Sequence, residues 1–126
     1  MKKIRLIMLL IMPVFIFNCN TNKNENLLGK YFNNYENNVL HFVELKKDNT
    51  YLHYYEGKNH TVKRNIGTWK SIKKGDEIEI MFSSWIDYGY LNEPVCNSCT
   101  NFVKLEDGEL IFNQDLPKET NFVKRD

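Results

Sequence analysis

Alternation of apolar and polar residues is the dominant pattern of the chain after residue 28. In residues 77–82 every second side chain is apolar, which is the period of a β-strand with one buried face. Turn sequences such as Lys47-Asp48-Asn49 separate similar segments. The pattern predicts eight strands, at residues 29–32, 39–46, 50–56, 60–72, 77–82, 101–105, 109–113 and 121–125.

Nearly all connections between the predicted strands are short, which favours an antiparallel meander over a fold with crossover helices. Ala is absent and aromatic residues are frequent, which also disfavours long helices. Closing the meander would remove its exposed edges. We therefore expect an all-β protein, a small barrel of about eight strands, with a bend at Gly67 and a core formed by Trp69, Ile78, Ile80 and Phe82.

The first 18 residues have the pattern of a targeting sequence. Lys2, Lys3 and Arg5 form a positive start, and an apolar run of 12 residues follows at 6–17. This run is too short for a membrane span of about 20 residues but fits a signal-peptide core of about 7–15. We expect residues 1–18 to be a signal peptide and the Asn-rich residues 19–27 to be a polar tether.

Cys19 directly follows the apolar core and precedes the tether. In this position it resembles the lipidated cysteine of bacterial lipoproteins. The resemblance implies cleavage before Cys19 and a membrane anchor of N-terminal acyl chains, because one chain alone binds a membrane only marginally. With Asn20 rather than Asp after the cysteine, it also implies the outer membrane of a Gram-negative cell envelope.

Four later segments carry a second likeness: Gly29-Lys30-Tyr31-Phe32, the hairpin 43–51, Gly67-Thr68-Trp69-Lys70 and Glu109-Leu110-Ile111-Phe112. In these segments the chain resembles the small lipocalin-like lipoproteins of Gram-negative bacteria. The resemblance implies a lipocalin-like β-barrel over residues 28–126. It carries no catalytic residues and no assigned ligand.

The charge balance narrows the function classes. The chain has 17 basic and 16 acidic residues, a formal charge of +1, and loss of residues 1–18 would leave 14 basic and 16 acidic residues. A nucleic-acid-binding domain normally has a basic excess, so we expect no nucleic-acid partner. The sequence also shows no nucleophile–base pair and no set of four metal ligands. We therefore expect no enzyme, no cofactor and no metal site.

Cys96 and Cys99 are the two thiols that remain if Cys19 is acylated, and the compartment is oxidising. A disulfide can form when the Cα atoms lie about 4.4–6.8 Å apart. A redox-active pair would need a helix N-terminus, and a zinc site would need two further ligands. We predict a structural disulfide that braces the surrounding loop.

His41 and His53 fall on neighbouring predicted strands. If the turn between these strands has three residues, Val43 pairs with His53, and both histidines share a face with Tyr51 and Tyr55. Such a cluster inside a barrel could hold a metal or haem. We favour the simpler interpretation, two amphipathic side chains near the barrel mouth.

Residues 83–100 read as an irregular connection, and long loops often carry function. Trp85, Tyr88 and Tyr90 lie in it, and aromatic side chains are enriched at recognition sites. We predict that these three residues bind a ligand or partner. The competing interpretation is that residues 83–91 continue a strand whose aromatic side chains enter the core.

Two functions follow from these expectations. The first is a membrane-anchored, non-enzymatic lipoprotein whose barrel binds a small apolar ligand or an envelope partner. The alternative is an inhibitor or immunity-type lipoprotein that blocks an enzyme through the 83–100 loop. An apolar pocket would favour the first function, and a filled core with an exposed aromatic patch would favour the second.

Overall fold

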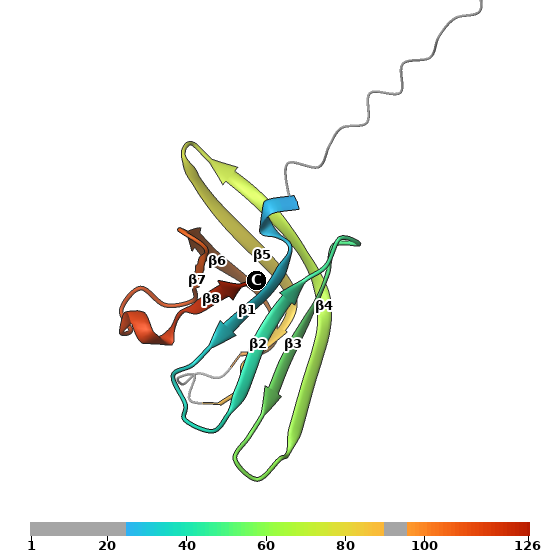
Figure 1. Cartoon of the computed structure of the whole chain (residues 1–126). Coiled ribbons are helices and arrows are strands. Elements are labelled where there is room, and N and C mark those ends of the chain that lie inside the picture. The colour runs from blue at the N-terminus through green and yellow to red at the C-terminus, as the bar shows by residue number, and fades with distance from the viewer. Residues whose placement is uncertain (1–24, 90–95) are drawn as a thin grey trace, which may run out of the picture.

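A computed structural model describes residues 25–89 and 96–126. Eight antiparallel strands, each paired with its sequence neighbour, form a closed barrel in which β1 also pairs with β8 (Figure 1). A 3-10 turn, η1 (Glu25–Leu27), precedes the barrel, and η2 (Lys118–Thr120) precedes the last strand. The strands are β1 (Gly29–Asn33), β2 (Leu40–Leu45), β3 (Thr50–Glu56), β4 (Val62–Lys74), β5 (Glu77–Ile86), β6 (Asn97–Glu106), β7 (Glu109–Ile111) and β8 (Phe122–Arg125).

The predicted all-β barrel of eight strands is confirmed. The β2–β3 hairpin has the expected register, with Val43 opposite His53. Asn49 closes this hairpin with a φ of 63°, a left-handed conformation that Asn tolerates. The alternation of side chains along β2 and β3 therefore points the same residues inward as the sequence predicted.

Aromatic side chains fill much of the barrel interior. Trp69, Ile80 and Phe82 are buried as predicted, and Ile78 packs against them. Gly67 lies where β4 passes close to its neighbours, because a Cβ at this position would press against the Ser83 carbonyl oxygen and lie 2.7 Å from a ring carbon of Tyr51. The largest fully buried side chains are Trp85, Tyr31, Tyr51, Phe82, Phe122, Leu45, Ile80, Leu110, His41, His53, Val43 and Val103.

The prediction that residues 83–100 form one irregular loop is wrong at both ends. Strand β5 continues to Ile86, and β6 begins at Asn97. The register shifts between Phe82 and Trp85, and Ser84 has a φ of 53°. This bulge changes the alternation, so that Trp85, three residues after the inward Phe82, also points inward. Residues 90–95 lie outside the described residues.

The antiparallel order gives the barrel two distinct ends (Figure 1). The proximal end carries η1 and the β2–β3 and β4–β5 turns. The distal end carries the β1–β2 and β3–β4 connections, residues 34–39 and 57–61, and the described ends of the β5–β6 connection, residues 87–89 and 96. The first described element therefore lies at the end opposite these connections.

An aromatic row crosses the outer face of β1, β2 and β3. Phe32, Phe42 and Tyr54 are register partners, with ring centroids 5.5 and 5.0 Å apart. The row ends on cations: Arg64 lies 5.4 Å from the Tyr54 ring and Arg125 lies 5.6 Å from the Phe32 ring. These rings stabilise the sheet through cross-strand and cation–π contacts.

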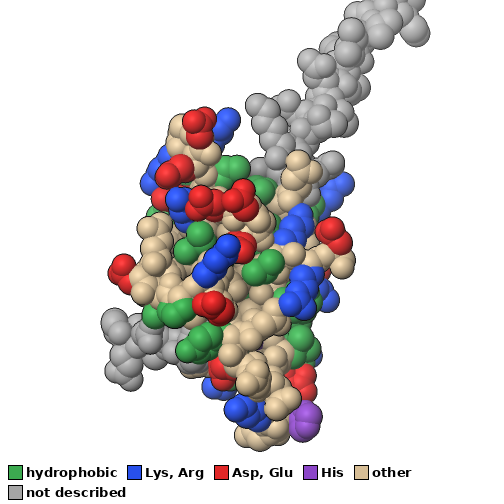
Figure 2. Space-filling view, turned by 60° about the vertical axis from the view of Figure 1, so that its left-hand side comes forward, with side chains coloured by type: hydrophobic (Ala, Val, Ile, Leu, Met, Phe, Trp, Pro, Cys, Tyr) green, Lys and Arg blue, Asp and Glu red, His purple; other side chains and the backbone are tan. Residues whose placement is uncertain are grey.

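On the face shown in Figure 2, acidic and basic side chains are interspersed, with small hydrophobic groups between them.

Candidate functional site

Two buried histidines face each other in the distal half of the barrel. The Nε2 atoms of His41 and His53 lie 2.8 Å apart, and the side chains are 2% and 0% exposed. The ring centroids are 5.1 Å apart, with an interplanar angle of 21°. In two rings that lie end to end, the centroid separation is the Nε2–Nε2 distance plus about the width of one ring. The two distances fit this arrangement. One Nε2–H therefore points directly at the other Nε2.

Aromatic rings surround the histidine pair. His53 stacks on Trp85 at 4.1 Å and contacts Tyr88 at 4.6 Å, whereas His41 meets the edges of Tyr55 and Phe122. Burial lowers the pKa of His41 to about 4. Burial, and then the neighbouring His41, lower the pKa of His53 well below its ordinary value. Both imidazoles are therefore neutral at pH 7.

The outer nitrogens of the pair have no well-aligned partner among the described residues. Neither Nδ1 has a hydrogen bond of good geometry to any of them. The backbone of Ile86 opposes part of the lowering of the His53 pKa. Between the two rings one Nε2 donates and the other accepts, and the tautomer of the pair decides which.

A partly apolar surface lies above the pair at the distal end. Leu40 and Val62 are 43% and 44% exposed, and both are register partners of Glu56 on the outer face. Tyr35, in the β1–β2 connection, is 48% exposed. Two cavities of about 450 and 300 Å³ open at the same end and share Val39 and Gly57 in their walls, and Leu40 lines the smaller one. We call Tyr35, Leu40, Val62 and the two cavities the distal surface.

Tyr55 and Tyr88 connect the distal surface to the histidines. Tyr55 lines the larger cavity and donates a hydrogen bond to the Glu36 carboxylate at 3.1 Å, while its ring touches His41. Tyr88 contacts His53 and lies 6.0 Å beneath the Lys63 ammonium. A shift of either imidazole would therefore move a side chain at the barrel mouth.

The structure describes two of the three predicted recognition residues, Trp85 and Tyr88, and both contact His53. Trp85 is fully buried in β5, and its placement in a surface loop is wrong, because the bulge at Ser84 turns it into the core. Tyr88 follows β5 at the distal end and is 9% exposed. Tyr90 and the predicted lipidation site Cys19 lie outside the described residues. Leu40 and Val62 were not predicted as site residues, and the only signal for them in the sequence is their alternation with inward neighbours.

The predicted disulfide is present between Cys96 and Cys99, whose Cα atoms are 5.9 Å apart. The Asp87 side chain joins the two ends of the β5–β6 connection. Its carboxylate accepts hydrogen bonds from Trp85 Nε1 and from the Cys96 N–H, each at 2.8 Å. The Asp87 N–H also donates to the Cys96 carbonyl at 2.8 Å. The connection is thus fixed at its base by the barrel core.

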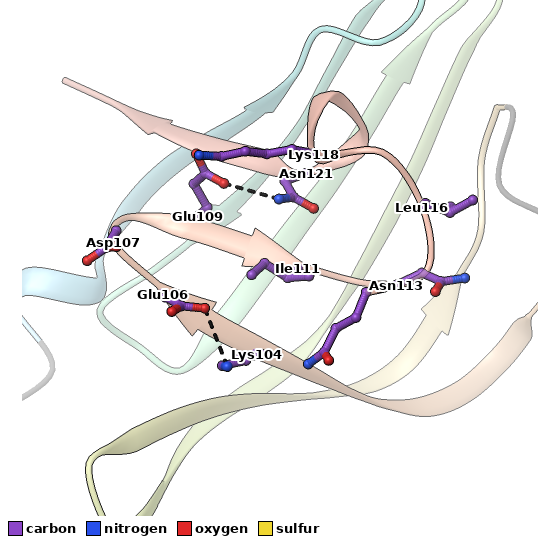
Figure 3. A pocket seen from close by; sticks show the side chains of 10 residues that line it. Lys104, Glu106, Asp107, Glu109, Ile111, Asn113, Leu116, Lys118 and Asn121 are labelled. Carbon is purple, nitrogen blue, oxygen red and sulfur yellow. Dashed lines mark hydrogen bonds and ion pairs between the residues drawn. The ribbon is translucent and has the colours of Figure 1, made fainter.

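A third cavity, of about 420 Å³, lies beside β7 on the side of the barrel (Figure 3). Four of its five charged side chains, all except Asp107, lie in ion pairs with one another. Lys104 lies 3.4 Å from Glu106, and Glu109 accepts a hydrogen bond from Asn121 at 3.1 Å and lies 3.8 Å from Lys118. With these groups occupied, the cavity offers less for recognition than the distal surface.

Within residues 25–89 and 96–126, no group of three or more His, Cys, Asp or Glu side chains is placed to hold a metal ion. No helix in the same residues is both long and apolar enough to span a bilayer. Comparison with protein-family models, with curated proteins and with solved structures finds no match to this chain.

Proposed function

We propose that this protein is a membrane-anchored, non-enzymatic lipoprotein of the outer membrane whose distal surface binds an envelope partner. The supporting observation is the position of its exposed apolar side chains. Tyr35, Leu40 and Val62 lie at the end of the barrel opposite η1, the first described element, which follows Cys19 in the sequence. A lipid anchor at Cys19 would hold the proximal end at the membrane and present the distal end away from it.

The packing of the interior favours a partner outside the barrel over an apolar ligand inside it. A barrel of eight strands has room for its own side chains or for one small ligand. Here Trp85, Tyr51 and Phe82 are fully buried and contact one another with ring centroids 5.0–5.7 Å apart. The three cavities described above open at the surface and have mixed polar and apolar walls.

The charges around the distal surface indicate the chemistry of the partner. The carboxylates of Glu36 and Glu56 accept hydrogen bonds from Tyr55 and Tyr54 of the same barrel. Lys58 and Lys63 line the larger cavity and are exposed. The surface thus combines apolar side chains with charged groups of both signs at its rim. It fits a protein with an apolar contact flanked by polar and charged groups.

The inhibitor or immunity-type function is a narrower form of this proposal. The filled interior favours it. So does the hydrogen bond from the Cys96 N–H to the Asp87 carboxylate, because a connection fixed in this way loses little conformational entropy on binding. Its contact would be made by the distal surface together with residues 87–89, the described start of the β5–β6 connection. The 83–86 and 97–100 stretches belong to β5 and β6.

The anchor is tested by Cys19→Ser in the full chain. Metabolic labelling with a radioactive fatty acid should disappear, and the protein should no longer sediment with membranes. The unchanged chain is labelled in parallel. Continued labelling of the variant would contradict the proposed lipid anchor.

The binding surface is tested by a photo-crosslinking amino acid placed at single positions in living cells. Positions 40 and 62 should give one discrete crosslinked species. Positions 66 and 102 are the matched controls, because Ile66 and Phe102 are 67% and 54% exposed but lie away from the distal end. Equal crosslinking at all four positions, or none at the distal positions, would contradict the assignment of the distal surface.

A further inference from the structure

We propose that the His41–His53 pair is an acid-operated switch that loosens the distal end of the barrel while the proximal end stays folded. The switch is a property of the barrel itself. That it releases a partner rests on the proposed function of the distal surface.

The geometry of the pair allows one proton between the rings and opposes a second. The two Nε2 atoms point at each other across 2.8 Å in a site closed to water. The first added proton charges an imidazole whose Nδ1 has no well-aligned partner among the described residues. The second places two N–H groups and two positive charges head to head. Separation of the rings relieves both conflicts.

The acidic groups nearest the pair are committed elsewhere. From the β1–β2 connection, Glu36 accepts the Tyr55 hydroxyl hydrogen bond. After β5, Asp87 accepts from Trp85 Nε1 and the Cys96 N–H. Among the described residues no ion pair joins either histidine to a carboxylate.

The other titratable groups around the pair do not offset its charge either. From β1 and β3, burial raises the pKa of both Tyr31 and Tyr51 to about 12, and burial raises the pKa of Tyr55 and Tyr88 as well, so all four stay neutral. From β4, Lys63 adds a positive charge above Tyr88. Strand β8 contributes the neutral ring of Phe122. Among the described residues, a proton taken up by the pair therefore meets no carboxylate in direct contact.

The contacts of the pair direct its response to the distal end. His53 is stacked on Trp85 and touches Tyr88, and His41 touches Tyr55. These three side chains support the β5–β6 connection and the wall of the larger cavity. The proximal half has separate supports, among them the hydrogen bond from Trp69 Nε1 to the Lys46 carbonyl at 3.1 Å. Ring separation therefore disturbs the distal contacts first.

The lowered pKa values set the direction of the change. The ordinary histidine pKa is 6.5, and that of His41 in the barrel is about 4. The closed state resists protonation throughout this interval, whereas an open state with hydrated rings takes up protons. Acidification from pH 6.5 toward 4 therefore favours the open state.

The two tryptophans of the chain report on its two ends. Trp69→Phe leaves the distal Trp85 as the fluorophore, and Trp85→Phe leaves the proximal Trp69. In the full chain in detergent micelles, titrated from about pH 7 to about pH 4, Trp85 emission should shift to longer wavelength at a higher pH than Trp69 emission. Coincident shifts would mean general acid unfolding, and no Trp85 shift would mean no opening; either result overturns the switch.

Variants of the pair show whether it causes the shift. His41→Gln and His53→Gln, each in the Trp69→Phe background, should displace or remove the Trp85 transition. His60→Asn, an exposed control that retains a left-handed backbone with φ 61°, should leave it unchanged. If neither Gln variant folds, the titration of the two tryptophan variants alone still decides. Because these measurements use no partner, failed crosslinking at positions 40 and 62 would overturn the proposed function without touching the switch.

Discussion

The Nε2 atom of His41 lies 2.8 Å from the Nε2 atom of His53 inside a barrel that otherwise buries mainly apolar side chains. The two rings form a hydrogen bond with each other through one nitrogen atom of each. Each therefore depends on its partner more than on any other residue of the core.

Replacing both members of this pair should cost less stability than the sum of the two single replacements. His41→Leu leaves a polar nitrogen of His53 buried without a partner, and we expect a loss of about 1–3 kcal/mol in the free energy of unfolding. The double variant His41→Leu/His53→Leu should lose less than the sum of the two single losses. Urea unfolding of the four proteins in a double-mutant cycle measures this coupling. Simple additivity would contradict the contact.

Stability should fall with acid because of the same pair. The unfolded chain binds protons on these histidines below pH 6.5, but folded His41 does so only near its pKa of about 4. Stability is therefore full above pH 6.5 and is lost as the pH falls toward 4, by about 3 kcal/mol for His41 alone. Urea midpoints at neutral and acidic pH measure the loss. The double Leu variant should show a flatter dependence, and an unchanged slope would contradict this origin.

Gly67→Ala should destabilise the barrel. The added methyl group would press against the Ser83 carbonyl and the Tyr51 ring, in the place where the Tyr51 hydroxyl donates to that carbonyl at 2.7 Å. Overpacking of this kind costs about 1–3 kcal/mol. Gly57→Ala is the matched control, since its Cβ would meet its nearest atoms at 3.4 Å or more. Equal melting temperatures for the two variants would be the contrary result.

Asp87→Ala should weaken the base of the β5–β6 connection. It removes the acceptor of Trp85 Nε1 and of the Cys96 N–H, and a buried donor left unpaired costs about 1–3 kcal/mol. The control is Asp115→Ala, because Asp115 is exposed in the β7–β8 connection. Thermal unfolding should show a clear decrease in melting temperature for Asp87→Ala alone. Equal melting temperatures for the two variants would mean that the hydrogen bonds to the Asp87 carboxylate contribute nothing to stability.

The strand order of the barrel was predictable from period-two alternation and turn residues. The β2–β3 register also followed, because a three-residue turn places Val43 opposite His53 and both histidines on one face. What alternation could not give was the distance between the rings. The structure shows that the two rings meet end to end and are buried. The simpler sequence interpretation had placed these two histidines near the barrel mouth.

The stretch around Ser84 shows why the predicted site was misplaced. Alternation breaks after Phe82, and in sequence such a break looks like the end of a strand. In the structure it is a bulge with Ser84 at a φ of 53°, after which pairing resumes at Trp85 opposite Cys99. A bulge depends on the partner strand, here β6, whose register the local sequence does not contain.

The distal surface was hidden for a related reason. Leu40 and Val62 are ordinary strand residues far apart in sequence. They lie on either side of Glu56 in one cross-strand row, because Leu40 pairs with Glu56 in one hairpin and Val62 pairs with it in the next. A single exposed apolar residue does not indicate a binding site. A group of them at one end of the fold does, and that grouping is visible only in the structure.

Recognition at the distal surface is tested by one double substitution. A photo-crosslinker at position 35 reports the partner in cells, and Leu40→Ser/Val62→Ser removes the neighbouring apolar contacts. We predict loss of the crosslinked species with the melting temperature unchanged, while the control Ile66→Ser/Phe102→Ser keeps both. An undiminished crosslink in a folded distal variant would contradict the claim.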